Sequence, residues 1–117
     1  MAELKDGHIQ TDTLTPERFG FQRVPLDRLR VDHVTESLDI LLSVLNQEAG
    51  PARDIVVLNA GAAIYAANLV ETLEEGMARA KSVIDNGSAK KKLEDLIAWT
   101  QTRGAEAKEN HALRGRV

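Results

Sequence analysis

Hydrophobic and polar positions divide the chain into an alternating N-terminal segment, residues 1–31, and a mostly helical remainder. Short alternating runs flank Asp6-Gly7, and glycine supplies the positive φ that a tight hairpin turn requires. Ile9 and Thr11 continue the second strand. Two short strands are not a stable unit in water. The pattern therefore predicts a β-hairpin and loop segment that needs a partner sheet.

A single capped turn is predicted directly after the hairpin. Thr15 suits the N-cap, Pro16 the first helical position, and Glu17 the positive end of the dipole. Phe19 and Phe21 can anchor this turn on a core.

Helical spacing governs the second segment, residues 32–103. Thr35 is the expected cap of a first helix, whose apolar positions follow the i, i+3, i+4, i+7 rule: Leu38, Leu41, Leu42 and Leu45. Gly50-Pro51 should end this helix and open the next one.

The second helix is apolar nearly all the way round from Ile55 to Ala67, with Asn59 its one polar residue. A helix without a polar face must be surrounded, so it should be the central one. Gly61 in mid-helix costs about 1 kcal/mol relative to alanine, a cost that close helix packing would justify.

Two further helices are predicted before a polar tail. Thr72 and Glu75 form a capping box, in which each side chain bonds the other residue's amide. The buried stripe of this third helix is Leu73, Met77, Ala80 and Ile84.

Asn86-Gly87 should end the third helix and Ser88 should begin the fourth. Residues 104–117 are expected to form a frayed polar tail. The predicted fold is thus an α/β fragment, mostly helical: a hairpin followed by about four helices packed round one apolar central helix (Ile55–Ala67).

The amino-acid composition argues against several classes of function. Of 117 residues, 43% are hydrophobic and only four are aromatic, which argues against a stacking platform for single-stranded nucleic acid, and the net charge of −3 argues against a basic nucleic-acid surface. The absence of cysteine excludes a thiolate metal site and a cysteine nucleophile, and it fits a reducing compartment. The apolar run at Ile55–Ala67 is too short to span a membrane, and the N-terminus is too polar for a signal peptide. A cytoplasmic location is expected.

No residue is predicted to be catalytic, to bind a cofactor or to ligate a metal. His8, His33 and His111 lie in a turn, a loop and a tail, without ligand-spaced partners. The chain contains no nucleophile elbow and no glycine-rich phosphate loop.

Three features admit a functional and a plainer interpretation. Lys90, Lys91 and Lys92 in the first turn of a helix oppose its dipole, which a bound phosphate would relieve. The favoured alternative is a solvated surface in which Lys90 pairs with Glu94 and Lys91 with Asp95. Asn59 could line a pocket, although such an asparagine more often bonds a neighbouring carbonyl. Glu74 and Glu75 are interpreted as cap residues and not as an acid/base pair.

Four stretches of sequence resemble one enzyme family: Ala2–Gly7, Thr15–Phe21, Gly50–Tyr65 and Thr72–Leu93. The most specific is Pro-Ala-Arg-Asp followed by Asn-Ala-Gly-Ala-Ala. Together they resemble the C-terminal part of anthranilate phosphoribosyltransferase, over the chain from Ala2 to about Gln101. The resemblance implies transfer of a phosphoribosyl group from phosphoribosyl pyrophosphate to anthranilate in tryptophan biosynthesis, with Mg²⁺, in an enzyme that is commonly a homodimer.

The family's Gly-Thr-Gly-Gly-Asp loop, Lys-His-Gly-Asn segment and Asp-Glu metal pair do not occur in this sequence. No functional residue is therefore carried over, and the chain is expected to bind no Mg²⁺ itself. The favoured hypothesis is a scaffold portion of the transferase, inactive alone, whose partner is the rest of the transferase chain or a second copy. The alternatives are a nucleoside-phosphorylase-like paralogue and a free-standing helical interaction or dimerisation module.

Overall fold

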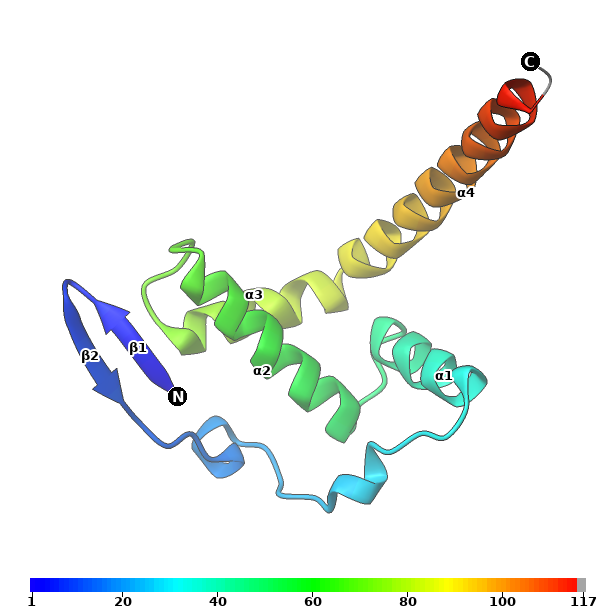
Figure 1. Ribbon diagram of the computed structural model, residues 1–117. Helices are drawn as coiled ribbons and strands as arrows, with labels where there is room; N and C mark the ends of the chain where they lie inside the picture. The colour runs from blue at the N-terminus through cyan, green and yellow to red at the C-terminus, as the bar shows by residue number, and fades with distance from the viewer. Residues whose placement is uncertain (116–117) are drawn as a thin grey trace.

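The computed structural model describes residues 1–115 and contains a hairpin followed by four helices (Figure 1). The strands are β1 (Ala2–Lys5) and β2 (His8–Thr11), and two 3₁₀ turns follow at Pro16–Phe19 and Leu26–Arg28. The helices are α1 (Val34–Leu45), α2 (Pro51–Ala66), α3 (Leu73–Asp85) and α4 (Ser88–Arg114). The predicted fold class is confirmed, with α2 lying between α1 and α3 (Figure 1).

The hairpin forms as its turn residues predict. Asp6 (φ 51°) and Gly7 (φ 78°) both have positive φ, as the tight two-residue turn requires. Leu4 lies opposite Ile9 and Glu3 lies opposite Gln10 in the antiparallel ladder. These pairs are on opposite faces of the ribbon, since side chains alternate along a strand.

The predicted cap of the first 3₁₀ turn has the expected position but no capping bond, and the predicted cap of α1 lies inside the helix. Thr15 occupies the N-cap of the turn at Pro16–Phe19, but its side chain makes no capping hydrogen bond. The helix α1 begins one residue before Thr35, with His33 as its N-cap. The Glu36 carboxylate accepts a hydrogen bond from the Asp32 amide at 2.9 Å, which satisfies a donor that precedes the helix.

The core lies where α2 crosses α3, with a contribution from α1. Its buried side chains are Val44, Val57, Leu73, Met77 and Ile84. Gly61 of α2 is buried against Met77 of α3: a Cβ on Gly61 would lie 2.7 Å from the Met77 Cα. The prediction that Gly61 permits close helix packing is confirmed.

The enclosure of α2 is less complete than its composition predicts. Val57 and Gly61 are its buried residues, whereas Ile55, Val56, Asn59 and Ala63 are exposed. The helices α1 and α3 cover two sides of α2 and leave the rest of its apolar surface open. The prediction of a fully surrounded helix is wrong for the described residues.

The fourth helix is longer than predicted. It runs through Gly104 to Arg114, so the expected frayed tail is helical as far as Arg114; residues 116–117 lie outside the described residues. The segment after Gly104 consists largely of good helix formers, including Ala105, Glu106 and Ala107, and Arg103 pairs with Glu106 at 3.1 Å. All of these residues are exposed, as a polar tail should be.

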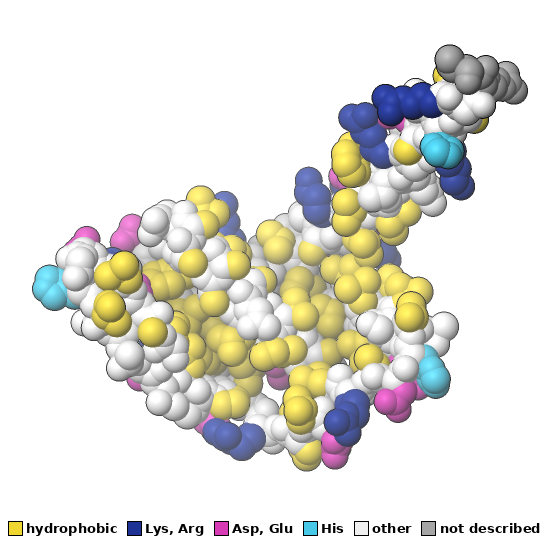
Figure 2. Space-filling model, viewed as in Figure 1, with side chains coloured by type: hydrophobic (Ala, Val, Ile, Leu, Met, Phe, Trp, Pro, Cys, Tyr) yellow, Lys and Arg dark blue, Asp and Glu magenta, His cyan; other side chains and the backbone are white. Residues whose placement is uncertain are grey.

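The chain is extended and exposes an unusual amount of surface for its mass. Its radius of gyration is 19.2 Å, against about 13 Å for a compact domain of this length. Its accessible surface is 9266 Å² at 12.8 kDa, against roughly 6,300 Å² for a folded monomer of that mass. Part of the excess belongs to α4, which projects from the body, and part to an open hollow over α2 (Figures 1 and 2).

Between residues 1 and 115, no helix is both long enough and apolar enough to cross a membrane.

Candidate functional site

On the face shown in Figure 2, an apolar hollow lies between the hairpin and α1. Hydrophobic side chains gather there over α2 and α3, whereas charged side chains lie mainly at its margins (Figure 2). Ile55 and Val56 of α2 are 41% and 40% exposed, and Leu38 and Leu41 of α1 are 49% and 46% exposed. A large apolar patch on a folded protein marks a surface that another polypeptide or ligand covers.

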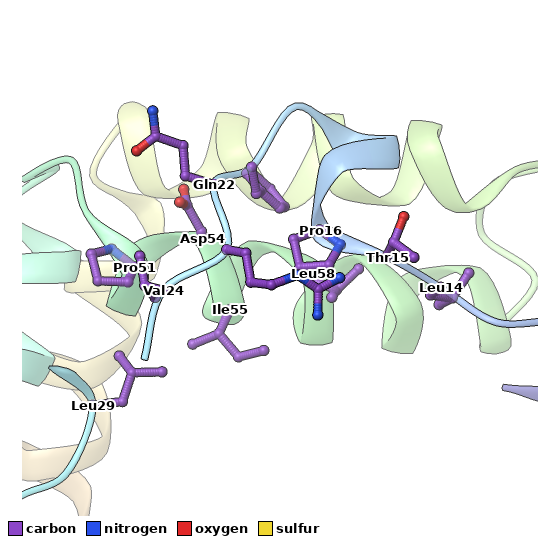
Figure 3. Close-up of a pocket in the computed structure, with 12 residues that line it drawn as sticks. Leu14, Thr15, Pro16, Gln22, Val24, Leu29, Pro51, Asp54, Ile55 and Leu58 are labelled. Atoms are coloured by element: carbon purple, nitrogen blue, oxygen red, sulfur yellow. The ribbon is translucent and has the colours of Figure 1, made fainter. Parts of the chain in front are cut away.

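One pocket lies where the loop after the hairpin crosses the start of α2 (Figure 3). Its volume is about 330 Å³, and its apolar walls include Leu14, Phe21, Leu29, Ile55 and Leu58. Asp54, Gln22 and Arg23 supply its main polar groups. The Arg23 guanidinium donates to the Glu17 carboxylate at 3.0 Å, and this hydrogen bond holds the pKa of Glu17 below its ordinary value. The apolar walls of this pocket suit an apolar group.

A second pocket, of about 540 Å³, separates the hairpin from the end of α2. The Tyr65 hydroxyl of α2 donates a hydrogen bond to the Glu3 carboxylate of β1. The Lys5 ammonium lies 5.9 Å from the centre of the Tyr65 ring, which is within reach of a cation–π interaction. The hydrogen bond to Glu3, reinforced by desolvation, raises the pKa of Tyr65. These contacts turn the polar face of the hairpin towards α2.

A polar joint forms where four helix ends converge. Arg53, whose side chain is 16% exposed, donates to the Asp85 carboxylate at the end of α3 and to the Gln47 carbonyl after α1. Lys90 donates to the Asn46 side chain at 2.8 Å. Both cations lie at the C-terminal end of α1, where the helix dipole favours positive charge.

The joint corrects one predicted pairing and confirms another. Lys91 pairs with Asp95 at 3.1 Å as predicted, but Lys90 bonds Asn46 and not Glu94. A longer-range partner relieves the conflict of Lys90 with the dipole of its own helix. Arg53 was not predicted as a contact residue, although its place in the first turn of a helix, where a cation is unfavourable, indicates that it needs a partner elsewhere.

One of the two hydrogen bonds predicted for the capping box at the start of α3 is confirmed. The Thr72 hydroxyl accepts from the Glu75 amide at 3.1 Å, whereas the Glu75 carboxylate accepts from the Glu71 amide at 2.9 Å and not from Thr72. Glu74 lies 3.6 Å from Arg18 in an ion pair. The interpretation as a cap residue thus holds for Glu75, whereas Glu74 pairs with Arg18 and makes no capping bond. Asn59 is exposed on α2.

The three histidines are on separate elements. His8 begins β2 and bonds the Asp6 carbonyl at 2.9 Å, His33 is the N-cap of α1, and His111 is near the end of α4. Among residues 1–115, no three side chains of the metal-ligating types come together as a metal site would require.

Comparison with known sequences decides the family. A profile of the glycosyl transferase family, a/b domain, matches residues 1–90. The chain belongs to this family. Anthranilate phosphoribosyltransferase of Methylococcus capsulatus is 54% identical over 101 residues, which are 86% of this chain and 30% of the relative. The enzyme of the same name from Acidovorax sp. (strain JS42) is 47% identical over 105 residues, or 90% of this chain and 30% of the relative. The enzyme of the same name from Clostridium beijerinckii is 45% identical over 96 residues, which are 82% of this chain and 28% of the relative.

The glycosyl transferase chain therefore spans about a third of the length of these relatives. The matching part is their C-terminal portion. The resemblance inferred from the Pro-Ala-Arg-Asp segment is confirmed, and that segment forms the first turn of α2 beside the polar joint.

Proposed function

We propose that this chain forms the C-terminal scaffold of an enzyme that transfers a phosphoribosyl group from phosphoribosyl pyrophosphate to anthranilate. Relatives named for that activity, at 43–54% identity, support the proposal. In this reaction Mg²⁺ stabilises the departing pyrophosphate, and positioning supplies much of the remaining acceleration. The groups that would do this belong to polypeptide outside residues 1–117, so the chain alone is inactive.

The open apolar hollow is the observation that carries the proposal. The chain exposes roughly 3,000 Å² more than a compact monomer of its mass. One side of a standard protein interface buries about 800 Å². Part of this excess belongs to the projecting helix α4, and the part over the hollow is the surface that the rest of an α/β domain would cover.

The hairpin supports the same conclusion. Leu4 and Ile9 form a cross-strand pair on one face and are 71% and 74% exposed, while Glu3 on the other face bonds Tyr65. The apolar face of the ribbon thus points away from α2. Such a face is built to be covered by another element, and the remaining α/β domain is the partner that we propose. We place the enzyme in the cytoplasm, a location with which a chain free of cysteine is compatible.

A chimera tests the proposal. The matching C-terminal part of the Methylococcus capsulatus relative is replaced by this chain, and formation of phosphoribosyl-anthranilate is followed by the loss of anthranilate fluorescence in the presence of Mg²⁺. The chimera should be active, and the isolated chain should form no product. A matched chimera carrying Gly76→Leu, which blocks the crossing of α2 and α3, should lose activity together with folding. A folded but inactive chimera, or product formation by the isolated chain, would overturn the proposal.

A further inference from the structure

Asn86 and Gly87 form the turn that joins α3 to α4 (Figure 1). The Asn86 side chain is exposed, and its oxygen accepts a hydrogen bond from the Ser88 amide at 2.9 Å. Gly87 has a φ of 80°, and a Cβ built on it would meet nothing within 4 Å. The backbone nitrogen of Gly87 is therefore unshielded on the side where other residues carry a side chain. A side-chain amide and an accessible backbone amide thus adjoin each other in an open turn.

We propose that Asn86 is a site of spontaneous deamidation, at which the side-chain amide is converted to a carboxylate. The Gly87 nitrogen loses its proton to hydroxide and forms a bond to the Asn86 Cγ, an attack within one chain that needs no second molecule to be brought in. The bond from Cγ to the side-chain nitrogen breaks, and that nitrogen takes a proton from water and leaves as ammonia. Water then opens the five-membered succinimide that remains. The net reaction consumes one water and releases one ammonia, with no oxidation or reduction.

The hydrogen bond to the Asn86 side-chain oxygen favours this attack. Negative charge collects on Asn86 Oδ1 when Cγ becomes tetrahedral, and the Ser88 amide already donates to that oxygen. A donor that is aimed at an oxygen where charge develops lowers the barrier of the reaction. Ser88 is the first residue of α4, so the positive end of the helix dipole acts on the same oxygen.

A second hydrogen bond slows the reaction without preventing it. The Gly87 amide donates to the Ile84 carbonyl at 3.2 Å, and this bond must break before the Gly87 nitrogen can turn towards Cγ. It lies beyond the last residue of α3, and opening the end of a helix costs much less free energy than unfolding a core. Asn86 should therefore react more slowly in the folded chain than in the unfolded chain, but by a small factor.

The other four asparagines lack this combination of features. Asn59 and Asn110 lie inside α2 and α4, where the amide of the following residue is hydrogen-bonded within the helix. Asn46 and Asn68 are each followed by a residue with a Cβ, which crowds the attacking nitrogen. Folding thus protects Asn59 within the body of the protein, and it leaves Asn86 in an open turn.

The two products of ring opening should affect α4 in opposite ways. Opening at the bond to the Asn86 carbonyl carbon gives isoaspartate, which puts an extra carbon into the main chain and disturbs the turn that places Lys90 against Asn46 at 2.8 Å. Opening at the bond to Cγ gives aspartate, which caps a helix as well as asparagine does. Its negative charge lies at the start of α4, where the helix dipole favours it and where the cations Lys90, Lys91 and Lys92 follow. Aspartate should therefore stabilise the joint, and isoaspartate should loosen α4 from the body.

The rates at individual asparagines are the first test. The full chain is incubated in mildly alkaline buffer, with and without urea, and deamidation at each position is measured by mass spectrometry of its peptides. In the folded chain Asn86 should react fastest of the five. Folding should slow Asn59 about a hundredfold or more and Asn86 about tenfold or less, so the ratio of the Asn86 rate to the Asn59 rate should rise. A ratio that does not rise on folding, or a faster reaction elsewhere in the folded chain, would overturn the proposal.

Matched variants test the chemistry at Asn86. Asn86→Gln keeps a side-chain amide but needs a larger ring to close, so release of ammonia by the folded chain should fall about tenfold or more. Asn59→Gln is the control and should leave the release of ammonia unchanged. Circular dichroism shows that each variant has kept its helices. Release of ammonia by Asn86→Gln at the rate of the parent chain would contradict the assignment.

The products are separated by ion-exchange chromatography, and isoaspartate is identified by enzymatic methylation of its carboxylate. Asn86→Asp and the aspartate product should unfold at the same urea concentration, higher than that of the parent chain, whereas the isoaspartate product should unfold at a lower one. An isoaspartate product as stable as the parent would contradict the role assigned to the turn. These measurements follow a covalent change and not phosphoribosyl transfer, so their result is separate from that of the chimera.

Discussion

Gly61 and Gly76 face each other where α2 crosses α3, so closely that a Cβ on Gly76 would overlap the Gly61 carbonyl oxygen. Neither residue has positive φ, so their requirement for glycine comes from the packing between helices and not from backbone conformation. The core side chains Val57 and Met77 flank this crossing. The two helices can approach this closely because neither Gly61 nor Gly76 has a side chain.

Adding one methyl group at this crossing should destabilise the chain. Gly61→Ala and Gly76→Ala are each expected to lower the free energy of unfolding by about 2 kcal/mol or more, because the neighbouring atoms are backbone that must move. Urea denaturation followed by circular dichroism measures the effect.

Gly104→Ala is the matched control, because a Cβ at that helical position meets nothing within 4 Å. It should raise stability by about 0.5–1 kcal/mol through helix propensity alone. Equal effects at Gly76 and Gly104 would show that the crossing is not tight.

Replacing Arg53 in the polar joint should lower the stability of the chain. Arg53→Gln removes the hydrogen bonds to Asp85 and to the Gln47 carbonyl and should lower stability by about 1 kcal/mol, a moderate value because Asp85 is 45% exposed. Arg53→Lys should not restore it, since one ammonium cannot reproduce the fork of the guanidinium. The exposed Arg103→Gln serves as control and should change thermal stability by less than about 0.5 kcal/mol. An Arg53→Lys variant as stable as the parent would contradict the two-bond geometry.

Two threonines at N-cap positions should behave differently. Thr72→Ala removes the hydroxyl that accepts from the Glu75 amide and should cost about 1 kcal/mol. Thr15→Ala should stay within about 0.5 kcal/mol, because the Thr15 side chain makes no capping bond. Chemical denaturation of both variants measures the contrast, and a larger loss at Thr15 would refute it.

Tyr65 is the one tyrosine of the chain, so its ionisation can be followed by ultraviolet absorbance. The hydrogen bond to Glu3 raises the pKa of Tyr65, and Glu3→Gln should lower that pKa towards the ordinary value. A pKa raised on folding means that the stabilising contact is present below the unfolded pKa of about 10 and is lost as pH rises through the folded pKa. The hairpin should thus detach from α2 in alkali. Identical titration curves for the parent and Glu3→Gln would contradict the contact.

Local signals in the sequence predicted most element boundaries. Asp6-Gly7, Pro51 and Asn86-Gly87 act through backbone conformation, which depends on a few neighbouring residues. The start of α1 was missed because the Glu36 carboxylate satisfies an amide before the helix, an arrangement that competes with Thr35 as a cap. The end of α4 was missed because Gly104 costs a helix only about 1 kcal/mol, which the alanines that follow offset.

For the site, the sequence predicted local roles better than distant partners: Glu75 accepts a hydrogen bond near the start of α3, whereas Glu74 pairs with Arg18, and His8 and His111 lie in a strand and a helix and not in a turn and a tail. The contact of Arg53 with Asp85 and that of Tyr65 with Glu3 could not be predicted. Each joins residues more than thirty positions apart, and no local pattern specifies such pairs.

The sequence by itself determined the helices, the hairpin turn, the glycine at the crowded crossing and the family, because each rests on short-range patterns or on direct similarity of residues. Only the tertiary structure decided which apolar surface is buried. A hydrophobic pattern shows that a face must avoid water, but the covering partner is set by geometry, and here α1 and α3 cover only part of α2 while the hollow stays open.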